Sequence, residues 1–163
     1  EVTPKNILKA AFGMTDDVAV AGDLVLESTP YTYFKNISNR KDIDPNGYID
    51  IIAHGLPNGM QIEINGKLKI VDHRYIGSIL KHSDNYTGQK IRLLSCNTGS
   101  LDNGFAQNLA NYMNVEVIAP TKYIWAYPSG KHIVAGGKQI NGNLVISLEE
   151  IGEMKKFFPD KIR

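Results

Sequence analysis

Two stretches of sequence decide the fold: YIDIIAHG at Tyr48–Gly55 and IRLLSCNTG at Ile91–Gly99. Each is a short apolar run that ends in a residue with useful chemistry, His54 in the first and Cys96 in the second, with a glycine close behind. Short apolar runs between turn signals are typical of strands buried in a parallel sheet. The two stretches therefore predict neighbouring parallel strands that end at His54 and Cys96.

The residues between these stretches predict a β-hairpin followed by a helix. MQIEI and KLKI alternate in polarity over Met60–Ile70, around an Asn65-Gly66 pair that suits a type I′ turn. Asp72 can then cap a helix over His73–His82, whose apolar residues fall on one face. We expect this hairpin as an insertion after the strand that carries His54.

The residues after the second stretch predict a parallel crossover. Phe105–Met113 has the spacing of a helix, with Asp102 or Asn103 available as its cap, and Val115–Ala119 follows as a third strand. Strand, helix and strand in this order form a right-handed parallel unit. The fold class is therefore predicted as α/β, with a mostly parallel sheet.

The remaining segments carry weaker signals. They predict one domain over residues 1–163, because 42% hydrophobic residues in 163 can build a single core. The expected elements are a helix at Lys5–Phe12, β-segments in Val18–Leu26, a strand-like Tyr31–Ile37, a loop at Ser38–Gly47, short strands at Tyr123–Tyr127, Ile133–Ala135 and Leu144–Ser147, and a closing helix at Leu148–Phe158 with Ser147 and Glu150 as capping box.

Composition excludes several classes of function. The chain has 18 Lys and Arg against 17 Asp and Glu, so it lacks the broad basic field of a nucleic-acid-binding protein. Its apolar runs are far shorter than the roughly 18–20 residues that span a bilayer. One cysteine allows no intrachain disulfide, and the four histidines lack ligand-like spacing. We therefore predict no metal, no cofactor, no nucleic-acid partner and no membrane span.

His54 and Cys96 together suggest nucleophilic catalysis. A thiolate is the nucleophile, and a nearby imidazole can take its proton and later give it to a leaving amine. Gly55 lets a substrate approach the backbone closely. Asp50 shares a strand face with His54 by the period of two, as an orienting group or as a solvated carboxylate. A lone cysteine after an apolar strand is otherwise commonly an inert core thiol.

The two stretches resemble the signature blocks of the caspase-like cysteine peptidases of clan CD, over roughly residues 48–130. The resemblance implies a caspase-like sheet with helices on both faces. It implies His54 as general base and acid, Cys96 as nucleophile, and the N–H groups of Gly55 and Cys96 as oxyanion hole. Peptide bonds would be cleaved through a thioester. The order of His54 before Cys96 favours this family over papain-like enzymes.

The same resemblance places substrate-binding segments after the third strand, where Thr121 and Trp125 are the candidates. Trp125 also forms a period-two aromatic stripe with Tyr123 and Tyr127, for which core packing is the alternative interpretation. Two other functions remain open. One is a Cys-His deamidase or acyltransferase, and the other is a non-catalytic binding module with an inert Cys96.

A narrower likeness concerns the stretches AHGLPNG, IRLLSCNTGS, GFAQNLAN and VIAPTKYIWAYPSG. They are similar to stretches in the C-terminal domains of bacterial polymorphic toxins, including contact-dependent and Rhs-type effectors. That likeness implies the effector domain of a larger secreted or surface-delivered bacterial protein that acts in a target cell. Its implied partners are a protein or peptide substrate and a cognate immunity protein.

Overall fold

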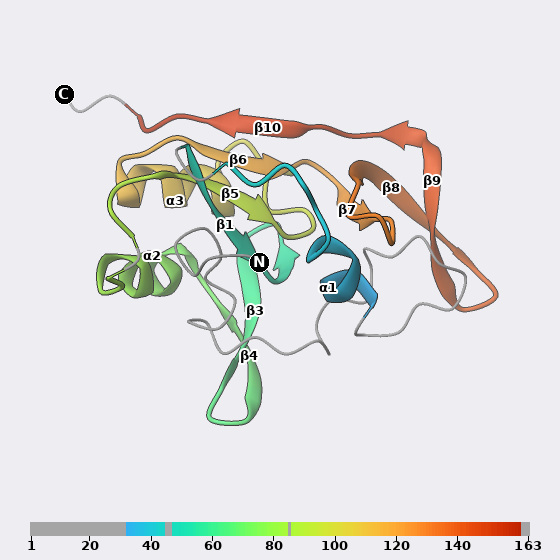
Figure 1. Cartoon of the computed structure of the whole chain (residues 1–163), viewed down its shortest axis with the longest axis horizontal. Helices are drawn as coiled ribbons and strands as arrows, with labels where there is room; N and C mark the ends of the chain where they lie inside the picture. Colours follow the sequence, from blue (N-terminus) through green and yellow to red (C-terminus); the bar gives the residue numbers. More distant parts are fainter. Residues whose placement is uncertain (1–31, 45–46, 85, 161–163) are drawn as a thin grey trace.

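A computed structural model describes residues 32–44, 47–84 and 86–160 of the chain. The predicted helix at Lys5–Phe12 and the β-segments in Val18–Leu26 lie outside these residues. The central sheet has four strands in the order β1 (Tyr48–Ile52), β5 (Lys90–Leu94), β6 (Val117–Pro120) and β10 (Met154–Phe157) (Figure 1). The first three are parallel and β10 is antiparallel to β6. The α/β class is confirmed, with a mixed central sheet.

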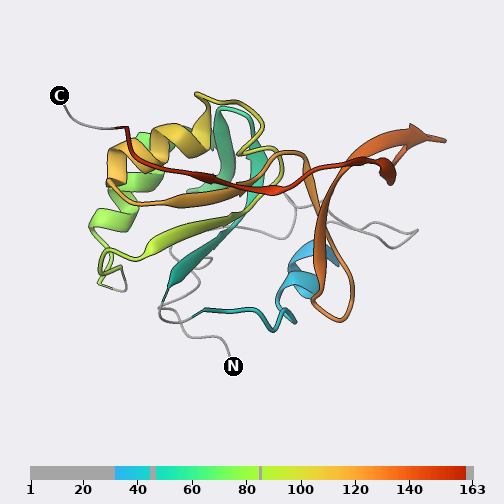
Figure 2. The same ribbon diagram turned by 90° about the horizontal axis from the view of Figure 1, so that it is seen from above.

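Helices contact both faces of this sheet. Successive strand residues point to opposite sides, so neighbouring residues of one strand pack against different helices. α2 (His73–Lys81) and α3 (Phe105–Met113) form one core with the side chains of Ile49 and Ile51 on β1. α1 (Thr32–Ile37) forms a second, smaller core with Ile52. Figure 2 shows α2 and α3 together on one side of the central strands and α1 on the other.

Two antiparallel sheets of three strands each extend from the central one. The first contains β2 (His54–Leu56), β3 (Gly59–Ile64) and β4 (Lys67–Val71). Asn65 and Gly66 join β3 to β4 with φ values of 51° and 78°, which confirms the predicted hairpin and its turn. The second contains β7 (Tyr123–Ala126), β8 (His132–Ile140) and β9 (Asn143–Ile151).

The strand-like prediction for Tyr31–Ile37 is wrong, since Thr32–Ile37 forms helix α1. The aromatic and branched residues that suggested a strand also suit one face of a helix. Ile37 lies three positions after Phe34 and four after Tyr33, which is the spacing of one helix face, and all three residues are buried in the smaller core. Burial of this face therefore outweighs the local strand preference of its residues.

The predicted closing helix at Leu148–Phe158 is also wrong. β9 continues to Ile151, and β10 pairs with the otherwise open edge of β6 over Met154–Phe157. Ser147 lies buried within β9 opposite Gly136, so it caps no helix. A capping box is a weak local signal, and here the hairpin pairing of β9 with β8 and the long-range pairing of β10 with β6 outweigh it.

The other two helices follow the prediction closely. Asp72 caps α2 by accepting from the backbone N–H groups of Arg74 and Tyr75. α3 covers the predicted range, but its N-cap is Gly104, without a side-chain cap. The backbone N–H of Phe105 instead donates to the Pro57 carbonyl at 2.9 Å, which explains why neither Asp102 nor Asn103 is needed there.

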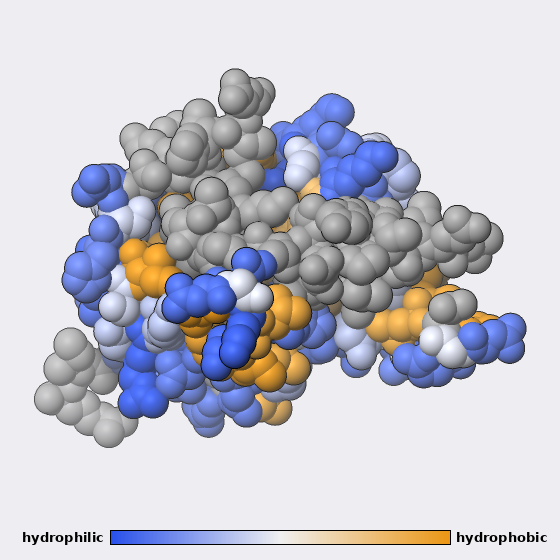
Figure 3. All heavy atoms as spheres, turned by 90° about the horizontal axis from the view of Figure 1, so that it is seen from below, coloured by the Kyte–Doolittle hydropathy of each residue, from blue (hydrophilic) through white to orange (hydrophobic). Residues whose placement is uncertain are grey.

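The outer strands leave apolar side chains in contact with solvent. Leu68 and Ile70 on β4, and Leu148 and Ile151 on β9, are exposed. Figure 3 shows apolar patches scattered among hydrophilic side chains on one face of the molecule.

Among the described helices, none has the length and apolar character needed to cross a membrane.

Candidate functional site

The two motifs leave the central sheet side by side. In the parallel register of β1 and β5, Ile52 lies opposite Leu94, so both strands end at the same level. The chain then passes through Ala53 to His54 at the start of β2, and through Ser95 to Cys96 at a turn. The predicted adjacency of the two strand ends is confirmed.

Gly55 brings the two motifs into direct contact. A Cβ added at this position would lie 2.4 Å from the carbonyl oxygen of Cys96 and 2.9 Å from the carbonyl carbon of Ser95. Real Cβ atoms do not approach other atoms so closely, so only glycine fits. The glycine after His54 is thus the residue that lets the backbones of the two loops touch.

The turn that carries Cys96 is held from several sides. Asn97 has a left-handed backbone with φ of 63°, and its N–H donates to the Lys122 carbonyl at 2.9 Å. The Thr98 hydroxyl donates to the Ser95 carbonyl at 2.9 Å. These bonds fix Cys96 between the end of β5 and the start of β7.

The thiol of Cys96 points into the smaller core. Only 6% of the residue is exposed, and the backbone N–H of Ile124 donates to its Sγ at 3.5 Å. Burial raises the pKa of the Cys96 thiol to about 11, although the bond from Ile124 partly opposes this rise. The group is therefore a protonated thiol at neutral pH in this arrangement. Its apolar neighbours in the cluster are Tyr33, Phe34, Ile37, Ile52, Leu94, Ile124 and Ala126.

The imidazole of His54 is half-buried and belongs to a different sheet. His54 pairs with Gln61 between β2 and β3. Burial lowers its pKa below the ordinary value, so the ring is neutral near pH 7 and can accept a proton. Within the described residues, no hydrogen bond or ion pair joins the imidazole to another side chain, Cys96 included. The backbones of the motifs are in contact, while no hydrogen bond joins the two reactive side chains.

The two predicted substrate-binding residues occupy different settings. Trp125 is fully buried on β7, and its Nε1–H donates to the Ala135 carbonyl at 3.1 Å. Thr121 is partly exposed, and its hydroxyl accepts from the Glu153 N–H at 3.0 Å, which ties it to the turn before β10. Trp125 thus packs as a core residue here, and substrate binding by either residue stays a prediction.

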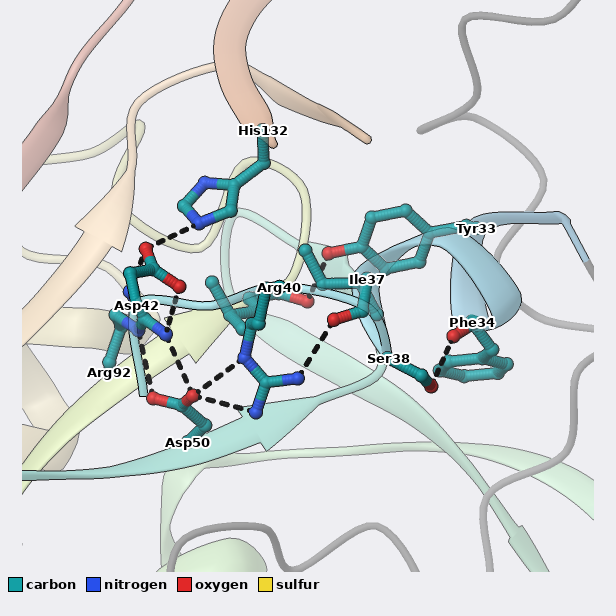
Figure 4. Close-up of polar contacts among 10 residues, drawn as sticks. Tyr33, Phe34, Ile37, Ser38, Arg40, Asp42, Asp50, Arg92 and His132 are labelled. Atoms are coloured by element: carbon teal, nitrogen blue, oxygen red, sulfur yellow. Dashed lines mark hydrogen bonds and ion pairs between the residues drawn. The ribbon is translucent and has the colours of Figure 1, made fainter. Parts of the chain in front are cut away.

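Figure 4 shows a buried charged cluster that was not foreseen from the sequence. It lies on the same face of the sheet as Cys96, because Asp50 alternates with Ile52, which packs in the cluster of Cys96. Asp50 is only 2% exposed, so the expectation of a solvated carboxylate is wrong. The Nε–H of Arg40 donates to Oδ2 of Asp50 at 2.9 Å. Nη2 of Arg40 lies 2.8 Å from the same oxygen and forms an ion pair without a hydrogen bond. Arg92 donates to both carboxylate oxygens at 2.8 Å. The carboxylate is bound by two arginines and does not orient His54.

Asp42 extends the cluster to the surface. Its carboxylate accepts from Arg92 Nη1 at 2.8 Å and lies 2.8 Å from Nε2 of His132 on β8. Burial opposes ionisation, but the hydrogen bond and charge of Arg92, together with His132, lower the Asp42 pKa to about 2. An open pocket of about 480 Å³ lies beside it and includes Lys41, Ser129 and Lys131.

One signal in the sequence could have revealed part of this cluster. Asp50 and Arg92 are opposite charges inside two apolar strands, and their Cα atoms are direct partners in the parallel register. Arg40 and Asp42 carry no comparable signal, because they lie in an irregular segment. Among the described residues, no group of three His, Cys, Asp or Glu side chains could hold a metal ion.

Comparison with known proteins gives a family without an assigned activity. The family model "Domain of unknown function (DUF8616)" matches residues 23–134, so the chain belongs to this family. No curated protein and no solved structure matches the chain. The matched range contains both motifs and the whole charged cluster, and the function has to be argued from these residues.

Proposed function

We propose that this member of the DUF8616 family is a cysteine peptidase that uses His54 and Cys96. The observation that carries the proposal is the contact of Gly55 with the backbone of Ser95 and Cys96, at the aligned ends of β1 and β5. Ligands of open α/β sheets bind outside the carboxyl ends of the strands. A histidine and a cysteine at that edge, joined through the contact of Gly55 with the Cys96 backbone, have the residue types and the location that such an enzyme requires.

In the proposed reaction His54 carries one proton in each of two steps, first from the thiol to the leaving amine and then from water to the departing thiolate. His54 takes the thiol proton of Cys96, and the sulfur attacks the substrate carbonyl while the N–H groups of Gly55 and Cys96 stabilise the oxyanion. His54 then gives the proton to the leaving amine, which produces a thioester. Water, deprotonated by His54, hydrolyses the thioester and regenerates the thiol.

The electrostatics of the pair fit a resting enzyme. A neutral imidazole is the form that can act as a base, and burial keeps His54 in that form. The Cys96 thiol is protonated and turned toward the smaller core, so it has to approach the imidazole before it can react. The proposal therefore requires a rearrangement around Cys96 on the way to catalysis.

The decisive experiment compares the wild-type chain with Cys96→Ala and His54→Ala on a peptide library. We expect new peptide termini with the wild type and none with either variant, and both variants should remain folded by circular dichroism. His54→Ala should also slow the alkylation of Cys96 by iodoacetamide at pH 7. His82→Ala, which alters an exposed histidine at the end of α2, is the matched control and should change neither result. Cleavage that survives Cys96→Ala would refute the proposal.

A non-catalytic binding module is the second candidate, and one observation favours it. Cys96 is 6% exposed with a pKa near 11, as expected for an inert core thiol. A deamidase or acyltransferase would use the same pair of residues. It differs in leaving the peptide chain uncut, so mass spectrometry of the same library separates it from a peptidase.

The biological setting is a proposal drawn from the sequence likeness to polymorphic toxins. We propose that the chain is the effector domain of a larger delivered bacterial protein, with a protein substrate in the target cell and a cognate immunity protein. Production of the wild-type chain inside bacteria should then arrest growth, and Cys96→Ala should not. Equal growth of the two strains at equal expression would contradict this setting.

A further inference from the structure

β7 has one edge paired with a strand and one edge without. The Tyr127 N–H donates to the Lys131 carbonyl at 2.8 Å, and Trp125 lies opposite Ile133 on β8. Because hydrogen-bonded and non-hydrogen-bonded pairs alternate, the backbone groups of Ile124 and Ala126 point away from β8. In the described part of the chain, no strand pairs with this outward edge. Such an edge normally accepts another strand or is covered.

The outward edge is covered by groups from two other segments, the turn that carries Cys96 and helix α1. The Lys122 carbonyl accepts from the Asn97 N–H at 2.9 Å. The Ile124 N–H donates to Cys96 Sγ at 3.5 Å, and the Ala126 carbonyl accepts from the Asn36 side chain at 3.0 Å. The positions that an added extended peptide would bond are thus taken up, two of them by Cys96 and by a side chain of α1.

α1 also closes over the thiol itself. Tyr33, Phe34 and Ile37 are buried in one cluster with Cys96. The Tyr33 hydroxyl donates to the Leu94 carbonyl at 2.9 Å, so α1 bonds to the end of β5 as well as to β7. Among the described helices, α1 is therefore the one that packs over the thiol, and it bonds to both strands beside it.

The segment after α1 is anchored by the charged cluster (Figure 4). Arg40 pairs with Asp50 on β1, and Asp42 pairs with Arg92 on β5 and His132 on β8. α1 itself is attached by apolar packing and by hydrogen bonds such as those of Tyr33 and Asn36. This arrangement fixes the C-terminal end of α1 to the sheet through ion pairs, whereas the contact of the helix with β7 depends on packing and on the Asn36 bond.

We propose that α1 is a built-in cover that occupies the peptide-binding edge of β7 and keeps Cys96 latent. The inference rests on the proposed peptidase function, and it adds the regulation of that site. Displacement of α1 frees the outward carbonyl of Ala126 and exposes the thiol of Cys96. Movement of that thiol toward His54 then frees the Ile124 N–H, so that an extended peptide can bond along the edge. The charged cluster keeps the displaced helix tethered to the sheet.

The test measures alkylation of Cys96 by iodoacetamide at pH 7 in the full folded chain. Tyr33→Phe and Asn36→Ala each remove one bond that holds the cover, and each should speed labelling by about tenfold, since a lost buried hydrogen bond shifts local opening by about that factor. Tyr86→Phe is the matched control, because it removes a tyrosine bond of 2.8 Å to the Gln89 carbonyl away from α1. Labelling should stay at the wild-type rate there. Folded α1 variants that label no faster than the wild type would overturn the cover.

A second measurement needs no substitution. In the wild-type chain, hydrogen exchange of the Ser38 amide, bonded to the Phe34 carbonyl, reports opening of α1, and the Ile91 amide, bonded to the Glu116 carbonyl, reports opening of the sheet. Labelling of Cys96 should follow Ser38 as denaturant is raised. Labelling that follows Ile91 alone would overturn the cover. Faster labelling of the variants without peptide cleavage would leave the cover standing and refute the peptidase, whereas cleavage with unchanged labelling would do the reverse.

Discussion

The two faces of the central sheet differ in what they bury, although the same strands form both. The face under α2 and α3 buries apolar side chains such as Ile51 and Leu93, which pack against Leu109 of α3 and its neighbours in one large cluster. The face under α1 holds a smaller apolar cluster, the thiol of Cys96 and the buried pair of Arg40 and Asp50. One face therefore resembles an ordinary hydrophobic core, and the other combines packing with groups that are costly to bury.

This difference separates stability from candidate function. Apolar packing gains free energy at every position, and the α2–α3 face has no need of anything else. Buried ion pairs often gain little net stability, because removing the charges from water offsets much of their attraction. All the proposed chemistry lies on the α1 face or at its rim, and the predictions below probe this contrast.

The largest effect is expected from Asp50→Ala. The change leaves Arg40 fully buried and Arg92 largely buried without their carboxylate, which should cost about 3–5 kcal/mol of unfolding free energy. Leu109→Ala on the other face should cost about 2–5 kcal/mol through a cavity. Arg40→Met should restore part of the stability to Asp50→Ala and none to Leu109→Ala in urea titrations. An Asp50→Ala loss below about 1 kcal/mol would show that the cluster is not truly buried.

The next effect concerns the thiol at alkaline pH. Its folded pKa of about 11 lies above the ordinary value of 9.0, so its contribution to stability is present below pH 9 and is lost as the pH rises to 11. This contribution is about 2–3 kcal/mol. Compared with Cys96→Ala, the wild type should lose more unfolding free energy between pH 9 and 11. Parallel pH profiles would mean that the thiol is accessible to water.

A smaller effect should separate the faces within one strand. Ile51 and Ile52 are adjacent buried residues of β1, the first in the α2–α3 core and the second in the α1 core. Valine at either position should cost about 0.5–1.5 kcal/mol. Only Ile52→Val should also speed alkylation of Cys96 in the folded state, since Ile52 packs against the cluster that holds the thiol. Equal acceleration by both variants would show that labelling follows global unfolding.

The smallest effect is expected at the surface end of the charged cluster. The Asp42 pKa of about 2 lies below the ordinary 3.8, so its stabilisation is present above pH 4 and is lost as the pH falls toward 2. Half the side chain is exposed, and solvent screening keeps the gain below about 1 kcal/mol. In Asp42→Asn, the melting temperature should fall less than in the wild type as the pH is lowered from 4 to 2. A profile as steep as that of the wild type would assign the acid loss to other carboxylates.

Much of the central sheet could be read from local patterns. The strand ends at His54 and Cys96, the hairpin at Asn65-Gly66 and helix α3 were all predicted at nearly their observed bounds. Each depends on apolar periodicity or on turn chemistry within a few residues, and such signals act over short distances along the chain. The predicted neighbourhood of the two motifs followed from them.

What the sequence by itself determined is the alternation that gives each strand two faces and the pair of residues at the strand ends. Tertiary structure alone decided what covers each face. Helix α1 at Thr32–Ile37 is stabilised by partners far along the chain. The Tyr33 hydroxyl donates to the Leu94 carbonyl, 61 positions away, and the Asn36 amide donates to the Ala126 carbonyl, 90 positions away. Asp50 is buried because Arg40 and Arg92 converge on it from different segments. Whether a thiol or a carboxylate faces water depends on these distant partners, and no local preference encodes them.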